Sequence, residues 1–243
     1  VKEKVRAIYK YVQRSMQWDE SHGIYSFTGI KDAWDKKSGS VTDINFILIR
    51  FLRDAGIDAK PLLVSTKDNG IINSFYPFLN QFNGVLAYVV NGDETYVMNA
   101  ADKYNPFYLI PYDVLFTNAL VVDNSNGGIV KLENDIKADN NIFVTCSVGE
   151  DGKLSGQATV KSSDYARNIR METFQKKQLK GSFEDNNGIT VTTDSLEIIN
   201  EEDELMPLEQ KINFSGSLQS SGDYYFLPYH IFTSLGKNPF ISE

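Results

Sequence analysis

Residues 36–62, which read KKSGSVTDINFILIRFLRDAGIDAKPL, constrain the fold more than any other stretch of the chain. A turn at Gly39 leads into a predicted helix over residues 42–55, and Gly56 fits the left-handed position that ends many helices. Apolar side chains cover so much of this helix that we expect it to lie at the centre of its domain. A predicted strand over residues 59–65 follows directly.

The start of this helix is a place where chemistry is often found. In many α+β hydrolases and acyl transferases such a turn-to-helix junction holds the nucleophile. Here the junction offers Ser40, Val41 and Thr42, with no cysteine. Ser40 or Thr42 is a suitable N-cap, and Asp43 suits the positive end of the helix dipole.

The other elements expected in the first part of the chain are two helices and a hairpin. Apolar residues at helical spacing predict the helices, and Asn91-Gly92-Asp93 predicts the hairpin turn. We place the helices at 3–17 and 30–37, and the strands at 85–90 and 95–99. The proline-broken apolar segment 104–122 is expected to complete a first domain, residues 1–125.

Polar, glycine- and asparagine-rich sequence then indicates a domain boundary, which we interpret as a linker over residues 126–141. Residues 142–243 read as a small, mainly β, sandwich-like domain with one helix, and we expect its last strands to be missing. The helix is predicted from Ser163 to Lys176. Strands are predicted at 142–148, 154–160, 188–193, 195–200, 208–214 and 223–228.

Composition excludes several classes of function. The net charge of −8 comes with no large cluster of lysine and arginine, which argues against nucleic-acid binding. Every apolar run is far shorter than the roughly 20 residues that span a bilayer. Cys146 is the single cysteine, and its strand position predicts a buried apolar role. His22 and His230 share no ligand spacing, so we expect neither a metal nor a cofactor.

Taken together, the elements of residues 1–122 resemble the transglutaminase-like superfamily, whose fold is related to papain. The likeness lies in the order of elements: a long first helix, a glycine turn before an apolar helix, the exit Arg53-Asp54-Ala55-Gly56-Ile57, and a hairpin. The segments Ser65–Gly70, Tyr76-Pro77-Phe78 and Gln81-Phe82-Asn83 are similar to a branch found in secreted bacterial multidomain proteins with flanking β-domains. The resemblance alone implies an extracytoplasmic location, in the periplasm or at the cell surface, within a longer parent chain.

The resemblance also implies three catalytic positions, and this chain fills each with an unsuitable residue. The cysteine of the family's G-x-C-x-D pattern falls on Val41, which has no nucleophile. The histidine position is Gly84, and the position of the carboxylate that orients the histidine is Asn99. Because triad members act as a unit, the three replacements predict a catalytically inactive pseudoenzyme.

Three interpretations remain open at this point. The first is an inactive binding or scaffolding module for a peptide, a protein or a glycan. The second is a hydrolase or acyl transferase with a rearranged site, in which Ser40 or Thr42 is the nucleophile and His22 folds over the turn as its base. The third is a spacer between other domains. Side chains that we consider as a cleft lining, with core packing as the alternative, are Trp18, Trp34, Ser40, Thr42, Tyr76 and Phe78.

Overall fold

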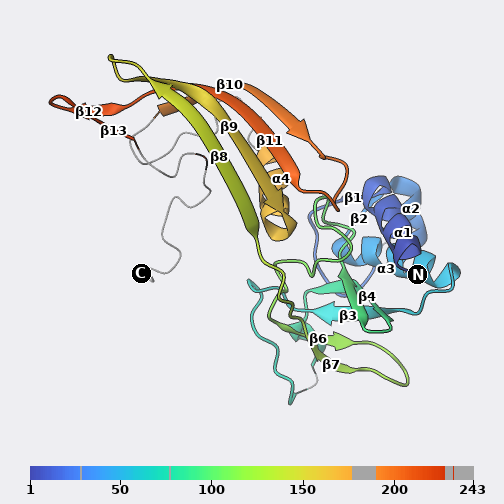
Figure 1. The fold of residues 1–243 in the computed structure, drawn as a ribbon. Coiled ribbons are helices and arrows are strands. Elements are labelled where there is room, and N and C mark those ends of the chain that lie inside the picture. Colours follow the sequence, from blue (N-terminus) through green and yellow to red (C-terminus); the bar gives the residue numbers. More distant parts are fainter. Residues whose placement is uncertain (28, 77, 177–189, 228–231, 233–243) are drawn as a thin grey trace. The chain divides into compact units, whose positions relative to one another are not determined.

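The structure is a computed structural model that describes residues 1–27, 29–76, 78–176, 190–227 and 232. It divides into two compact units, Val1–Asp135 and Ile136–Glu243 (Figure 1). The stretch expected as a linker contains the strand β7 (Gly128–Lys131) of the first unit and the start of β8 (Asp139–Val148) of the second. In the part of the chain that is described, no helix is long and apolar enough to cross a membrane.

The first unit joins three helices to a five-stranded antiparallel sheet of strand order β5-β4-β3-β6-β7 (Figure 1). Two very short parallel strands, β1 and β2, precede the sheet, and a 3-10 turn spans Leu79–Gln81. The elements are α1 (Lys2–Ser15), β1 (Gln17–Trp18), α2 (Ile30–Lys36), β2 (Ser38–Gly39), α3 (Val41–Asp54), β3 (Ala59–Val64), β4 (Gly84–Asn91), β5 (Glu94–Met98), β6 (Asn118–Val121) and β7.

Helix α3 is the centre of this unit, as its broad apolar face predicts. It packs against β3 and β4 on one side and against α1 and α2 on the other. Ile44, Leu48 and Leu52 are completely buried, and burial of each side chain contributes about 1.5–3 kcal/mol. The helix ends where Gly56 adopts φ 79°, so the chain turns sharply into β3.

Polar groups of α1 bind the chain that follows β5. The Tyr9 hydroxyl lies 2.9 Å from the Asn99 carbonyl oxygen and 2.8 Å from that of Asn105, so the two carbonyls share its single proton. Gln13 Nε2 donates to the same Asn105 carbonyl at 3.0 Å and to the Asp102 carbonyl at 2.6 Å. These buried hydrogen bonds join residues about 90 positions apart, so α1 and the segment 99–105 stabilise each other.

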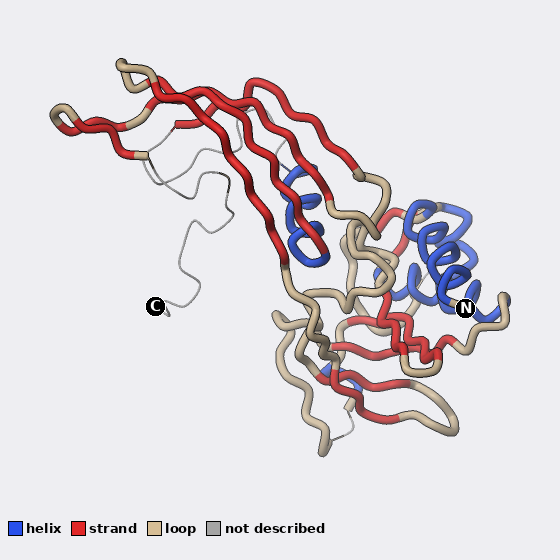
Figure 2. The backbone as a smooth tube through the Cα atoms, viewed as in Figure 1, coloured by secondary structure: helices blue, strands red, loops and turns tan. Residues whose placement is uncertain are grey.

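The second unit is a four-stranded antiparallel sheet of order β10-β11-β9-β8 with one helix packed on β8 and β9 (Figure 2). A separate hairpin of β12 (Gln219–Ser221) and β13 (Tyr224–Phe226) follows. The remaining elements are β9 (Lys153–Ser163), α4 (Asp164–Lys176), β10 (Thr190–Ile199) and β11 (Leu208–Ser217). Inward-facing Leu154, Val160, Ile212 and Phe214 form the core of this sheet.

Two details of the second unit differ from expectation. From residue 190 onward, the predicted strands 188–193 and 195–200 form one strand, β10, in which a register shift between Thr193 and Ser195 absorbs an extra residue; residues 188 and 189 lie outside the described part of the chain. A second sheet facing the first, as a sandwich requires, does not occur among the described residues. The broader prediction of the α+β class agrees with the structure, because the chain combines helices with mostly antiparallel sheets.

Candidate functional site

The three positions expected to carry catalysis begin or follow three neighbouring elements. Val41 is the first residue of α3, Gly84 is the first residue of β4, and Asn99 directly follows β5. Helix α3 packs on β4, and β4 pairs with β5. The structure therefore brings together the three elements, while none of the three positions offers a nucleophile, a base or a carboxylate.

An asparagine that the sequence analysis did not single out connects these elements. Asn45, one turn into α3, is completely buried. Its Nδ2 donates to the Val85 carbonyl and to Asn99 Oδ1, both at 2.9 Å, and its Oδ1 accepts from the Ala100 N–H at 2.9 Å. All the polar atoms of the Asn45 side chain are thus used in holding α3, β4 and the end of β5 together. The sequence signal for the role of Asn45 is the position of a single amide side chain on a helix face that is otherwise apolar.

The N-terminus of α3 is closed by the chain's own loop. The Val41 N–H donates to the Ser21 carbonyl at 3.3 Å, and Trp18 Nε1 donates to the same carbonyl at 3.0 Å. The Thr42 hydroxyl donates to the Gly23 carbonyl, and the Gly23 N–H donates to the Asn83 carbonyl at 2.9 Å. An N–H at such a helix start is a typical oxyanion donor, but here a backbone oxygen already occupies it. The Val41 side chain is itself 6% exposed.

Ser40 is the N-cap of α3 rather than a poised nucleophile. Its hydroxyl donates to Asp43 Oδ2 at 2.7 Å and accepts from the Asp43 N–H at 3.1 Å, which completes a capping box. The Ser26 hydroxyl donates to the other carboxylate oxygen of Asp43. Gly39 is needed here, because a Cβ would lie 3.0 Å from Asp43 Cβ and 3.2 Å from Ala33 Cβ. The local sequence is therefore explained by helix capping and close packing.

The histidine considered as a base does not pair with either hydroxyl. His22 is exposed, and its ring packs edge-on against Trp18 with 5.1 Å between ring centroids. The carbonyl of Gly23 is the acceptor for Thr42, and Asp43 is the acceptor for Ser40. Within the described part of the chain, no imidazole is therefore placed to take a proton from Ser40 or Thr42.

The aromatic residues expected near a cleft divide into two groups. Trp34 packs between Tyr11 and Phe51, with ring centroids 5.8 and 5.0 Å away, so it belongs to the packing of α1, α2 and α3. Trp18 packs partly buried against the core and donates to Ser21. Tyr76 and Phe78, in contrast, are 67% and 51% exposed.

Tyr76 and Phe78 belong to a larger exposed apolar surface that we call the aromatic surface. Its members lie on the loops 19–29 and 66–83 and have exposed fractions from 48% to 98%. They are Tyr25, Phe27, Ile71, Phe75, Tyr76, Phe78 and Leu79. The Gly23–Asn83 hydrogen bond joins the two loops, and Ile24 packs with the buried Ile72 and Phe82 beneath them. Large apolar side chains exposed together on two joined loops make this surface a candidate interaction site.

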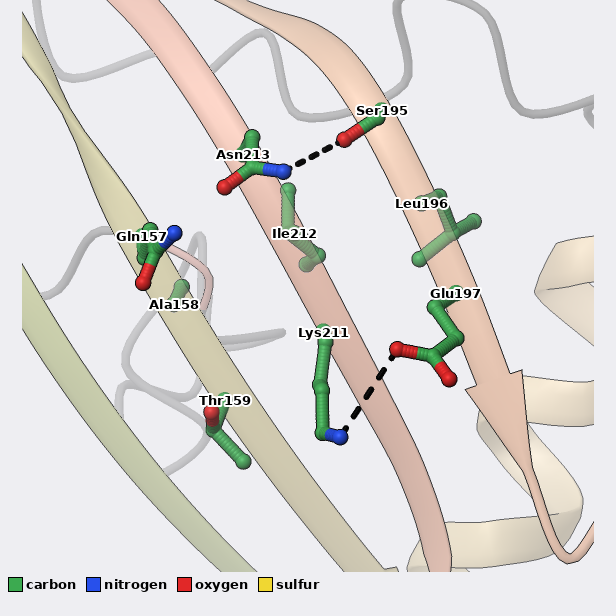
Figure 3. A pocket seen from close by; sticks show the side chains of 9 residues that line it. All are labelled: Gln157, Ala158, Thr159, Ser195, Leu196, Glu197, Lys211, Ile212 and Asn213. Atoms are coloured by element: carbon green, nitrogen blue, oxygen red, sulfur yellow. Dashed lines mark hydrogen bonds and ion pairs between the residues drawn. The ribbon is translucent and has the colours of Figure 1, made fainter.

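The second unit has a polar hollow of about 320 Å³ on the solvent face of its sheet (Figure 3). Several of its groups are already paired: Asn213 Nδ2 donates to Ser195 Oγ at 2.6 Å, and Lys211 lies 3.7 Å from Glu197. Ile212 and Leu196 point to the opposite, apolar side of the sheet. This hollow offers hydroxyl and amide groups but no arrangement for catalysis.

Metal and cysteine chemistry find no support in the described residues. In that part of the chain, which includes the acidic stretches 133–139 and 201–204, no three histidine, cysteine, aspartate or glutamate side chains are arranged so that they could hold a metal ion. Cys146 lies half-buried on β8 and packs with Ile142 and Val144 against the second core, on the face that its strand position predicts. His230 lies outside the described residues.

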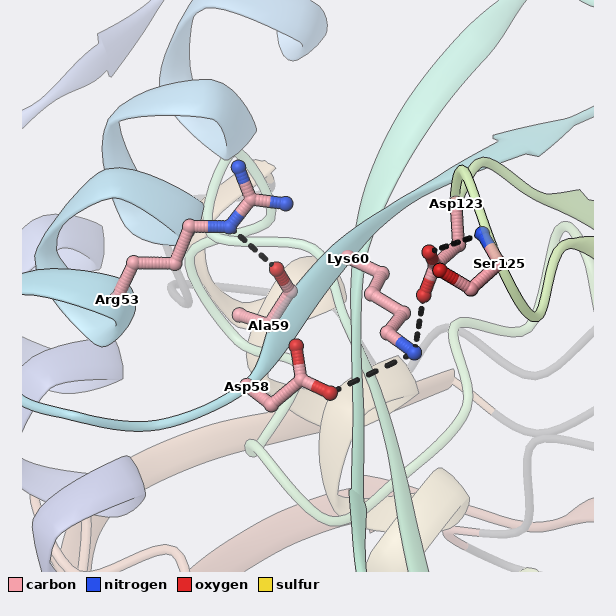
Figure 4. Close-up of polar contacts among 6 residues, drawn as sticks. All are labelled: Arg53, Asp58, Ala59, Lys60, Asp123 and Ser125. Carbon is pink, nitrogen blue, oxygen red and sulfur yellow. Dashed lines mark hydrogen bonds and ion pairs between the residues drawn. The ribbon is translucent and has the colours of Figure 1, made fainter.

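The cationic side chains of Lys60 and Arg53 hold strand β3 in place through polar contacts (Figure 4). Lys60 pairs with Asp123 and lies 3.5 Å from Asp58, and the Ser125 N–H donates to Asp123 at 3.0 Å. The hydrogen bond to Asp123 raises the pKa of Lys60, and the same bond lowers the pKa of Asp123. Arg53 Nε donates to the Ala59 carbonyl at 2.7 Å.

Comparisons of the chain with models of known protein families, with curated proteins and with solved structures find no match.

Proposed function

We propose that the first unit is a transglutaminase-like domain that no longer catalyses a reaction and serves as a binding or scaffolding module. The observation that carries this proposal is the closed start of α3, where the Val41 N–H is bonded to the Ser21 carbonyl. Val41, Gly84 and Asn99 supply no reactive group, and Asn45 uses the space between their elements for a structural clamp. Membership of the superfamily rests on the order of elements and motifs in the sequence.

The aromatic surface supports a binding role. The two loops that carry it are joined by the Gly23–Asn83 hydrogen bond, and the Gly23 carbonyl contacts the start of α3. Residues 69–92 contain no charged side chain although the chain carries a net charge of −8. An uncharged segment of exposed rings and amides suits a peptide, a protein or a glycan better than an ionic ligand. On the resemblance alone, we place this module outside the cytoplasm.

The alternative of a rearranged hydrolase or acyl transferase is less well supported. It requires Ser40 or Thr42 to lose a proton to a nearby base. Both hydroxyls are committed to hydrogen bonds within the chain, one to Asp43 and one to the Gly23 carbonyl. Freeing the Ser40 hydroxyl would remove the N-cap of α3, and freeing the Thr42 hydroxyl would remove the hydrogen bond that holds the loop at Gly23 against the helix start.

Two enzyme assays test the loss of catalysis. Purified protein is incubated with a fluorescent primary amine and a glutamine-rich acceptor, and separately with a panel of labelled peptides. We expect incorporation and hydrolysis to equal those of a protein-free blank. Turnover that is abolished by Ser40→Ala or His22→Ala would refute the inactive reading and establish the rearranged enzyme.

The binding role has its own test. A peptide and oligosaccharide panel is screened against the wild type, and each hit is measured again with Phe75→Ser, which removes a ring that is 91% exposed. Phe116→Ser is the matched control, because this ring is 65% exposed and lies outside the aromatic surface. We expect the first substitution to weaken binding and the second to leave it unchanged. Equal effects of the two variants would remove the aromatic surface from the proposal.

A further inference from the structure

A second concave site lies on the other half of helix α3, away from its closed N-terminus. It is a pocket of about 370 Å³, which falls within the roughly 300–1,000 Å³ range of small-molecule sites. Its apolar lining comes from Ile30 at the start of α2, Phe46 and Ile49 of α3, and Pro61 of β3. Ile49 is almost completely buried, so it forms the floor of the pocket.

Three charged side chains also line the pocket, and only two of them form an ion pair with each other. Arg50 Nε bonds to Asp54 at 2.9 Å, so these two charges compensate each other. Arg53 forms no ion pair within the described part of the chain, because Asp58 is directed to Lys60 instead. Two arginines and one aspartate give the lining a formal charge of 2 − 1 = +1.

The guanidinium of Arg53 is held in position by a backbone group. Its Nε donates to the Ala59 carbonyl at 2.7 Å (Figure 4), and its two terminal nitrogens form no hydrogen bond within the described part of the chain. A guanidinium fixed in this way presents a planar pair of donors that matches a carboxylate in a bidentate geometry. Fixing it in advance also reduces the entropy that a ligand must otherwise overcome.

We propose that this pocket binds a carboxylate attached to an apolar chain, such as a short fatty acid or the C-terminus of a peptide that ends in a large apolar residue. The apolar chain contacts Ile30, Phe46, Ile49 and Pro61, and the carboxylate binds the terminal nitrogens of Arg53. A single negative charge matches the +1 lining, whereas a phosphate dianion would leave excess negative charge in a chain that is already acidic.

Arg53 is the group on which this binding depends. It lies in the last turn of α3, where the helix dipole is negative and opposes a carboxylate. Asp54 would oppose it as well, but Arg50 compensates that charge. Without the Arg53 guanidinium, the pocket would therefore bind a neutral apolar molecule at least as well as an acid.

The test uses the full chain, labelled with 15N, and follows its amide resonances during titration. Probes are hexanoate, hexanol with the same chain length but no charge, and acetate with the charge but little apolar surface. We expect saturable shifts with hexanoate at residues 46–54, and at least tenfold weaker binding of the other two probes. Hexanol that binds as well as hexanoate, or hexanoate shifts confined to other residues, would overturn the proposal on the wild type alone.

Two variants then test whether Arg53 supplies the positive charge that binds the carboxylate. Arg53→Gln is expected to weaken hexanoate binding at least about tenfold, because a charge-assisted pair of hydrogen bonds is lost. Lys36→Gln is the matched control, since it removes an exposed cation outside the pocket and should leave the affinity unchanged. Thermal unfolding of both variants verifies that they are folded. Unchanged affinity in a folded Arg53→Gln protein would refute the role of Arg53.

A pair of tripeptides ending in leucine, with a free or an amidated C-terminus, separates the two ligand sources. Tighter binding of the free peptide than of hexanoate assigns the pocket to peptide C-termini, and the reverse order assigns it to fatty acids. Equal binding of the free and amidated peptides would contradict recognition of a carboxylate.

Discussion

Replacing Asn45 by alanine should destabilise the first unit strongly. The substitution removes three hydrogen bonds of 2.9 Å from a side chain that is completely buried. It leaves the Val85 carbonyl and the Ala100 N–H without partners, and each unsatisfied buried group costs roughly 1–3 kcal/mol. Asn99 Oδ1 keeps its bond from the Ala101 N–H at 3.2 Å and contributes less. We therefore expect a loss of about 3–5 kcal/mol, a large part of the 5–15 kcal/mol typical of a domain.

Tryptophan fluorescence in urea measures this loss. Both tryptophans of the chain, Trp18 and Trp34, lie in the first unit, so the signal reports on that unit. With a slope of roughly 1–3 kcal/mol/M, the unfolding midpoint of Asn45→Ala should fall by at least about 1 M. Asn80→Ala is the matched control, because Asn80 is exposed on the surface of the same unit, and it should change stability by less than about 0.5 kcal/mol. A loss below about 1 kcal/mol in Asn45→Ala would refute the clamp.

Three further substitutions test other parts of the structure. Ser40→Ala removes the N-cap of α3 and should lower the stability of the first unit by about 1 kcal/mol in the same urea assay, with no effect on any turnover. The lowered pKa of Asp123 contributes stability that is present above the unfolded-state pKa of about 3.9 and is lost as pH falls through the folded-state pKa. Asp123→Asn should therefore flatten the dependence of the urea midpoint between about pH 5 and 3, and an unchanged slope would contradict the Lys60 pairing. Gly156→Ala places a Cβ 2.3 Å from the Thr145 carbonyl oxygen, so amide hydrogen exchange in β8 and β9 should accelerate, whereas Gly128→Ala meets no atom within 4 Å and should not affect exchange.

The elements that the sequence predicts well are those whose signals are local. The central helix is predicted at 42–55 and observed at Val41–Asp54, because its apolar periodicity and its cap lie within the segment itself. The turn at Asn91-Gly92-Asp93 is equally local, and Gly92 adopts the positive φ of 62° that the turn requires. The sequence predicts a linker at the position of strand β7, because four residues among glycines and asparagines carry too little apolar pattern to indicate a strand. They form a strand because they pair with β6.

The sequence leads to a hypothesis for the positions of the candidate site, but it does not predict how the start of α3 is closed. The positions Val41, Gly84 and Asn99 follow from motifs, and a motif can be read from side-chain types. The partner of the Val41 N–H is a backbone carbonyl, that of Ser21, and every residue carries the same carbonyl. The conformation of the loop determines which carbonyl contacts the Val41 N–H, so the type of residue at position 21 does not predict this contact. Asn45 was missed for a similar reason, since its partners Val85 and Ala100 act through their backbones.

The bonds between α1 and the segment 99–105 also set an order of events during synthesis. Tyr9 and Gln13 leave the ribosome long before their acceptors, the carbonyls of Asn99, Asp102 and Asn105, are made. At 5–20 residues per second, about 90 residues take roughly 5 to 20 s to translate. For that interval the apolar stripe of α1 can pack only against α3, and the polar groups of Tyr9 and Gln13 lack their final acceptors. The polar anchoring of α1 in the first unit is therefore completed only after the end of the hairpin has been synthesised.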